Sequence, residues 1–112
     1  SDRGYLCANE IEIGMLIPDP EIALFRHKLP AHIFFETVQL ARRWTGTAAT
    51  DAGIVYQSAN ADCLMNEATE KARALAYLGA NRKIYQKTKE RLFGKSSPIN
   101  SEHGASYLLS QV

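Results

Sequence analysis

The sequence predicts a mainly α-helical chain with a short β segment at its beginning, and three patterns carry this prediction. Apolar residues recur at helical spacing from Ala31 to Trp44 and again from Asn60 to Leu78, as in helices that bury one face. A basic segment from Arg82 to Phe93 follows Asn81, a residue type that favours helix N-termini. At the start, the short apolar run from Tyr5 to Ala8 is typical of a strand, and a second apolar stretch follows from Ile11 to Ile17.

Length and composition describe an ordinary folded chain. Its 112 residues are 46% hydrophobic and 22% charged, which suits one domain with a modest core. The net charge of +1 gives no global reason to expect a nucleic acid or a membrane as partner. Only two cysteines occur, Cys7 and Cys63, without a CxxC pair, so we expect neither a disulfide framework nor a metal site.

The compartment is constrained only by what the sequence lacks. No apolar run approaches membrane-spanning length, and no signal peptide is visible. We therefore expect a protein that is not secreted and that works in the cytoplasm or in the matrix of a mitochondrion or peroxisome.

The first half of the chain is expected to fold in short pieces. After the strand from Tyr5 to Ala8, which we expect to be buried, Pro20 begins a short helix that ends near Lys28. The longer helix from Ala31 to Trp44 has a wide apolar face, and a short helical turn from Thr47 to Gly53 follows it. The expected inward face of the longer helix consists of Ile33, Phe34, Thr37, Val38, Leu40, Ala41 and Trp44.

The second half is predicted to be entirely helical. The helix from Asn60 to Leu78 ends at Gly79, the basic helix runs from Arg82 to Phe93, and a weaker helix extends to about Ser110. The first strand has no visible strand partner within the chain. This balance, together with a start at Ser1, is what a piece of a longer protein would show.

Glu10 is the strongest candidate for chemistry. It lies between an apolar strand-like run and Gly14, and a carboxylate in apolar surroundings can move protons at neutral pH. An extended backbone would place Glu10 and Glu12 on one face. If only one of them is buried, the chain must bend near Asn9 or Glu10. We expect Glu12 to be solvated or ion-paired.

The order of the segments resembles the second half of a crotonase-superfamily enzyme. The resemblance rests on Asn9-Glu10-Ile11-Glu12-Ile13-Gly14, then Gly53-Ile54-Val55, then the helices from Asn60 to Leu78 and from Arg82 to Phe93. It implies the C-terminal part of a crotonase-like (ClpP/crotonase) α/β fold, including its helical trimerisation region. Residues 1–57 would end the core, and residues 58–112 would form the C-terminal helical region.

Within that superfamily, the sequence is most similar to Δ3,Δ2-enoyl-CoA isomerases. Hydratases typically have Pro-Glu where this chain has Asn9-Glu10, and a glycine-rich stretch where it has Ile17-Pro18-Asp19-Pro20-Glu21. The resemblance implies an acyl-CoA thioester substrate in fatty-acid β-oxidation, and coenzyme A as part of that substrate with no separate cofactor. It also implies a homo-oligomer, either a trimer or a dimer of trimers.

The resemblance also suggests roles for individual residues. Glu10 would shuttle the proton, and Asn9 would orient it or the substrate, although a turn residue fits Asn9 equally well. Lys83, Lys87 and Arg91 are candidates for holding the phosphates of coenzyme A, but a solvated helix face gives the same pattern. The oxyanion-hole donors belong to the half that precedes this chain, so the 112 residues alone should be nearly inactive. A hydratase and a non-catalytic helical assembly module remain alternatives.

Overall fold

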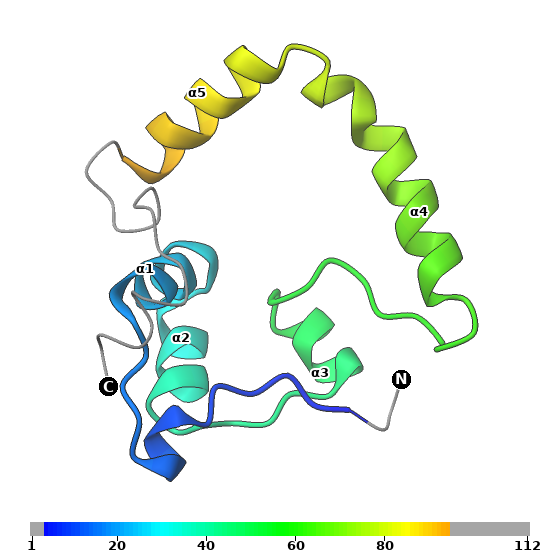
Figure 1. Cartoon of the computed structure of the whole chain (residues 1–112). Helices are drawn as coiled ribbons and strands as arrows, with labels where there is room; N and C mark the ends of the chain where they lie inside the picture. Colours follow the sequence, from blue (N-terminus) through cyan, green and yellow to red (C-terminus); the bar gives the residue numbers. More distant parts are fainter. Residues whose placement is uncertain (1–3, 95–112) are drawn as a thin grey trace.

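The computed structural model describes residues 4–94, which form helices joined by turns and extended connections (Figure 1). In chain order the elements are the 3-10 helix η1 (Glu10–Ile13), α1 (Asp19–Lys28), α2 (Ala31–Val38), α3 (Gly46–Asp51), α4 (Leu64–Leu75), the 3-10 helix η2 (Ala76–Gly79) and α5 (Arg82–Phe93). Within these residues no helix is both long and apolar enough to span a lipid bilayer. The weaker helix expected up to Ser110 lies outside the described residues.

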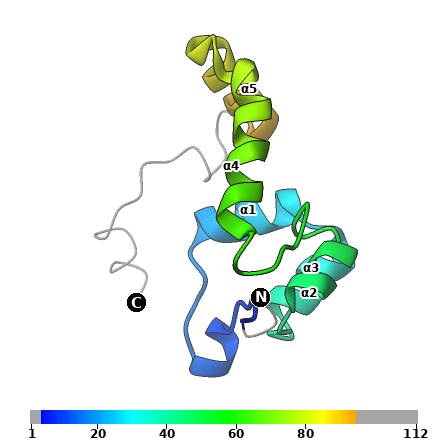
Figure 2. The same cartoon turned by 90° about the vertical axis from the view of Figure 1, so that its right-hand side faces the viewer.

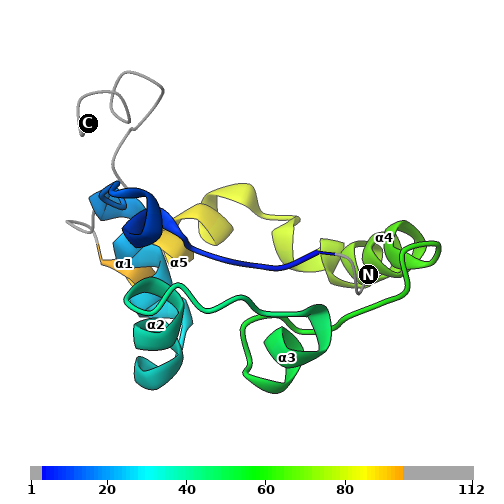
Figure 3. The same cartoon turned by 90° about the horizontal axis from the view of Figure 1, so that it is seen from below.

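The expected buried strand from Tyr5 to Ala8 is not confirmed. Residues 4–94 contain no named strand, and one isolated antiparallel bridge joins Leu6 to Trp44. Tyr5 is 62% exposed and Leu6 41% exposed, while Ala8 is buried. A strand needs a hydrogen-bonded neighbour along its length, and here Trp44 alone supplies one. Figures 1 and 3 show this segment beside the connection from α2 to α3.

The core is small and lies between α1, α2 and α3. Leu29, Ile33, Trp44 and Ala49 are buried against one another, and partly buried side chains surround them. These surrounding residues are Phe25, Phe34, Ala48, Ala52, Ile54 and Val55. Trp44 is 2% exposed and is the largest of the buried side chains, so it is expected to bury more apolar area than any other single core residue.

The helix expected from Ala31 to Trp44 begins where predicted but ends early, at Val38. Ala41 has a φ of +51°, a left-handed conformation that an α-helix excludes and that is costly for alanine. The chain turns there, so that Trp44 can pair with Leu6 through its backbone while its ring enters the core. Ile33, Thr37, Ala41 and Trp44 are buried as expected, but Leu40 is 60% exposed.

The helix expected from Asn60 to Leu78 is shorter than predicted: its α-helical part, α4, runs from Leu64 to Leu75 and continues as the 3-10 helix η2 to Gly79. Local capping signals predicted several other helix ends. The short turn expected at Thr47–Gly53 is α3, and Gly53 follows it with a φ of +76°. The basic helix has the predicted bounds, Arg82–Phe93. The side chain of Asn81 accepts a hydrogen bond from the backbone N–H of Ile84 at 3.1 Å, which satisfies one of the free donors of the first turn.

Helix α4 does not bury the apolar face that its sequence predicts, and the basic helix α5 is exposed as well. Neither helix has a buried residue, and Leu64, Met65 and Leu75 of α4 are each about half exposed or more. The two helices leave the core as an arch (Figures 1 and 2). At its far end the ring of Phe93 meets the ring of His27 at 4.7 Å. The radius of gyration is 16.2 Å, against about 13 Å for a compact domain of this size.

Replacing Trp44 with phenylalanine should destabilise the chain by about 2 kcal/mol, because the hydrogen bond from the indole N–H to Thr37 is lost and a small void remains. Urea unfolding followed by circular dichroism measures this. Tyr56→Phe is the matched control, since Tyr56 is fully exposed and its substitution should leave the midpoint unchanged. Equal midpoints for the two variants would contradict the central place of Trp44.

The isolated chain should self-associate, because the exposed apolar face of α4, with Leu64, Met65 and Leu75, is the kind of surface that another protein surface usually covers. Sedimentation velocity should show oligomers, and Met65→Glu combined with Leu75→Glu should shift the distribution towards monomer. Lys71→Glu, on the same helix, changes charge without removing apolar surface and is the control. A clean monomer with a cooperative melt for the unaltered chain would refute the expectation.

Candidate functional site

The carboxylate of Glu10 has an unusual environment for an acidic group near a surface. Its Oε2 atom is buried, and no described residue donates a hydrogen bond to it. Buried carboxylate oxygens in proteins are normally hydrogen-bonded, and an exception calls for an explanation. A substrate or another part of a longer protein is one kind of partner that would provide it.

The local fold explains how the Oε2 atom of Glu10 becomes buried while Glu12 stays exposed. The chain bends at the position expected from sequence, since the 3-10 helix η1 starts at Glu10. Gly14 closes the turn with a φ of +71°, and the N–H of Met15 bonds to the carbonyl of Glu10 at 2.9 Å. The bend separates the two carboxylates that an extended chain would have placed on one face.

Glu12 is ion-paired, as predicted, and its partner is Arg43. The Arg43 Nη1 and Nη2 atoms donate to Glu12 Oε1 and Oε2 at 3.1 and 2.9 Å, a two-pronged geometry that favours a fixed orientation. These hydrogen bonds, with the charge of Arg43 reinforcing them, hold the pKa of Glu12 below its ordinary value. The hydrogen bonds that Arg43 donates to Glu12 likewise raise the pKa of Arg43. Sequence analysis did not identify Arg43, because the pair is separated by 31 residues.

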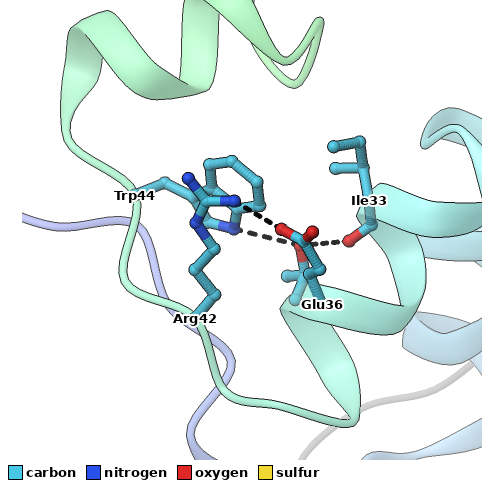
Figure 4. Close-up of polar contacts among 5 residues, drawn as sticks. Ile33, Glu36, Arg42 and Trp44 are labelled. Atoms are coloured by element: carbon cyan, nitrogen blue, oxygen red, sulfur yellow. Dashed lines mark hydrogen bonds and ion pairs between the residues drawn. The ribbon is translucent and has the colours of Figure 1, made fainter.

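A second cluster holds the connection that carries Arg43. The indole N–H of Trp44 donates to Thr37 Oγ1 at 3.1 Å, and that hydroxyl donates to the carbonyl of Ile33 at 2.7 Å. The guanidinium of Arg42 lies 3.9 Å from the centre of the Trp44 ring and pairs with Glu36. Figure 4 shows these groups converging from α2 and the connection after it. The buried hydrogen bonds of Trp44 and Thr37 fix the backbone beside Leu6 and Arg43, whereas the Arg42–Glu36 pair lies on the exposed side.

Asn9 lies next to Glu10 in the role of a turn residue. Its backbone carbonyl accepts a hydrogen bond from the N–H of Glu12 at 2.9 Å. Its side chain makes no capping hydrogen bond to η1. The turn role weighed in the sequence is therefore present, and a substrate contact by Asn9 stays a prediction.

The three basic candidates lie far from this turn along the fold. Lys83, Lys87 and Arg91 are exposed on α5, and their spacing of four residues places them along one side of that helix. Figures 1 and 2 show α5 and the turn of η1 at opposite ends of the view. The structure thus brings Asn9 and Glu10 together but not these three. If the ligand were a coenzyme A thioester, which is an extended molecule, its phosphates and its thioester could bind at separate sites, so the distance between α5 and the turn of η1 does not exclude these three residues.

The grooves described elsewhere in the molecule do not have Glu10 among their lining residues. One of about 450 Å³ lies between α4 and the loop before it, and residues of both segments line it. Its lining residues are Tyr56, Gln57, Ala59, Leu64, Glu67, Ala68, Lys71 and Leu75. Among residues 4–94 no group of three or more His, Cys, Asp or Glu side chains is arranged to hold a metal ion.

Comparison with solved structures identifies the fold. The chain superimposes on an enoyl-CoA hydratase from Mycobacterium ulcerans with a TM-score of 0.72 at 22% identity, covering 99% of this chain and 44% of that one. An enoyl-CoA isomerase from Mycobacterium tuberculosis gives a TM-score of 0.69 at 28% identity, with 82% and 40% covered. The architecture is that of part of a crotonase fold. No family model and no curated protein matches the sequence.

The neighbours also limit what the likeness means. The chain spans less than half the length of each of these structures, so it corresponds to a fragment of a crotonase-fold protein. A further structure, of a probable enoyl-CoA hydratase from M. tuberculosis, gives a TM-score of 0.70 at 24% identity. It bears the same locus name as the isomerase above. One crotonase-fold protein has therefore been described with both activities, and fold alone does not separate them.

The pKa of Glu12 should lie below the ordinary value of a glutamate, and Arg43→Gln should raise it. Carbon-detected NMR titration of glutamate carboxyls tests both statements. Because the folded pKa is the lower one, any stabilisation by the pair is complete above the unfolded pKa and is lost as the pH falls through the folded pKa. Arg42→Gln is the control and should leave Glu12 unchanged, and an identical Glu12 titration with and without Arg43 would contradict the assignment.

Proposed function

We propose that this chain is the C-terminal half of an enoyl-CoA isomerase in which Glu10 carries the proton. The observation that supports the proposal best is the buried Glu10 Oε2, to which no described residue donates a hydrogen bond. The likeness to crotonase-fold structures adds a family of enzymes that act on enoyl-CoA thioesters. Isomerase, rather than hydratase, rests on the sequence around Asn9-Glu10 and Pro18-Asp19-Pro20.

One carboxylate is enough for this reaction. Moving a double bond from C3–C4 to C2–C3 of an acyl thioester requires removal of a proton from C2 and its delivery to C4. The Glu10 carboxylate would accept the C2 proton, and the resulting carboxylic acid would return that proton to C4. No water is consumed, and the glutamate ends in its starting state.

The intermediate explains why the upstream half is required. Proton removal gives a dienolate, whose thioester oxygen carries the negative charge. Positioned hydrogen-bond donors stabilise such an oxygen, and loss of one donor typically costs about 10²–10³ in rate. Under this proposal those donors belong to the preceding half, and the chain contributes the base and part of the surface that encloses the acyl group.

The surface around Glu10 suits an apolar partner. Ile11, Ile13, Met15 and Leu16 follow it and are 50% to 81% exposed. Apolar side chains gathered at this exposure indicate a surface that is covered in the functional state. The acyl chain, the upstream half or both would cover it. Lys83, Lys87 and Arg91 would bind the phosphates of coenzyme A, since paired cations favour phosphate groups.

A hydratase is the second candidate, and it is favoured by the descriptions of two of the three structures compared above. Hydration adds water across the 2-enoyl double bond, and a second carboxylate usually helps to activate that water. Such a carboxylate would lie in the upstream half. The products separate the two reactions, because only hydration yields a 3-hydroxyacyl-CoA.

In the full-length parent, Glu10→Gln should lower the conversion of 3-enoyl-CoA by about 10²–10⁴-fold, the range typical of a lost acid–base group. Absorbance of the conjugated product measures the rate, and mass spectrometry detects any hydrated product. Glu36→Gln is the matched control and should retain turnover. Unchanged turnover in Glu10→Gln would favour a non-catalytic assembly role for this chain, and fast hydration of 2-enoyl-CoA would move the assignment to hydratase.

A further inference from the structure

The segment that bears Glu10 is hydrogen-bonded to two residues that are adjacent in sequence. Its beginning is bonded to Trp44, and its end is bonded to Arg43. At its start, the backbone N–H and carbonyl of Leu6 exchange hydrogen bonds with those of Trp44, both at 2.9 Å. At its end, the carboxylate of Glu12 accepts two hydrogen bonds from Arg43. Glu10 lies between these ties, in a short loop closed on the Arg43–Trp44 pair.

We propose that Glu12 and Arg43 are positioning residues that fix the direction of the Glu10 carboxylate, an inference that rests on the function proposed above. Neither side chain needs to touch substrate for this role. The Arg43–Glu12 pair would hold the turn of η1 against the connection after α2, and the turn would in turn aim Glu10. We name this pair and its two hydrogen bonds the turn clamp.

The surroundings of Glu10 create the need for such a clamp. Within residues 4–94, no side chain or backbone donor holds its Oε2 atom, so the direction of the carboxylate depends on the backbone that carries it. That backbone is held on one side by Leu6 and by the Cys7 thiol, which donates to the carbonyl of Ala41 at 3.6 Å, and both contacts precede Glu10. Beyond Glu10, the clamp adds to the internal hydrogen bonds of η1 in limiting the movement of the turn.

The chemistry makes small errors in direction expensive. The same carboxylate must reach two carbon atoms of the substrate in succession, and misplacement by about 1 Å can cost as much as 10²-fold in rate. A partial loosening of the turn should therefore reduce turnover by about tenfold. Substrate affinity should change little, because most of it comes from contacts elsewhere on the acyl-CoA.

The exposure of the clamp separates positioning from stability. The side chains of Arg43 and Glu12 are 50% and 42% exposed, and exposed ion pairs contribute little to folding. Their two-pronged geometry nevertheless restricts rotation of both groups. Loss of the clamp should therefore be visible in turnover while leaving the thermal midpoint almost unaltered.

The chain offers a matched control in the neighbouring ion pair. Arg42 pairs with Glu36, and these side chains are 49% and 33% exposed. This pair starts from the same connection after α2 but holds α2 and does not contact η1. Glu36→Gln therefore removes an ion pair of similar exposure without loosening the turn that bears Glu10.

Kinetics of the full-length parent on 3-enoyl-CoA test the proposal. We expect Glu12→Gln and Arg43→Gln each to lower kcat by about tenfold with KM changed less than twofold, while Glu36→Gln retains kcat. The double variant should be no slower than either single variant, because both remove the same interaction. Higher ionic strength should lower kcat of the unaltered protein towards that of Glu12→Gln, whose own kcat should stay constant.

Three results would overturn the turn clamp: kcat losses no larger than that of Glu36→Gln, losses that multiply in the double variant, or losses that follow the thermal midpoint. Glu10→Gln distinguishes this failure from failure of the proposed function. If Glu10→Gln is inactive while Glu12→Gln matches the control, the clamp alone is wrong. If Glu10→Gln remains active, the proposed function is wrong and the clamp is rejected with it.

Discussion

The pairing of Leu6 with Trp44 is the constraint on which the rest of the structure depends. One residue, Trp44, joins the N-terminal segment through its backbone, fills the core with its ring and hydrogen-bonds to α2 through its indole. Arg42 lies against the outer face of that ring. Removing the pairing would free the segment that carries Glu10 and would also open the core, so the structural and functional parts of the molecule share one anchor.

Residues close in sequence made some helix ends predictable, and contacts between distant residues made others harder to predict. Asn81 correctly predicted the start of α5, and Gly53 indicated the end of α3, because helix caps and left-handed turns depend on residues close in sequence. The helix expected to reach Trp44 was predicted too long, because helical spacing cannot show that the backbone of Trp44 forms hydrogen bonds with Leu6. The exposure of Leu40 and of most of α4 has the same origin, because burial depends on partners distant in sequence or outside the chain.

The candidate site was predictable in its acidic residue but not in its support. Glu10 stood out because a carboxylate follows an apolar run, and the expected bend beside it is present as η1. Nothing local in the sequence links Arg43 to Glu12, which lies 31 positions away. The basic residues of α5 are exposed as either interpretation requires, so their position does not choose between a phosphate site and a solvated face.

The separation between Glu12 and Arg43 has a consequence for the order in which the molecule acquires its shape. The contacts within α1 and α2 are local and can form quickly, whereas closing a loop of 31 residues carries an entropic penalty that must be met first. On this argument, α1 and α2 form first and place Arg43 near Glu12, and the turn of η1 becomes ordered afterwards. The proton-carrying group would be among the last parts to become ordered during maturation, and among the first released when the fold loosens.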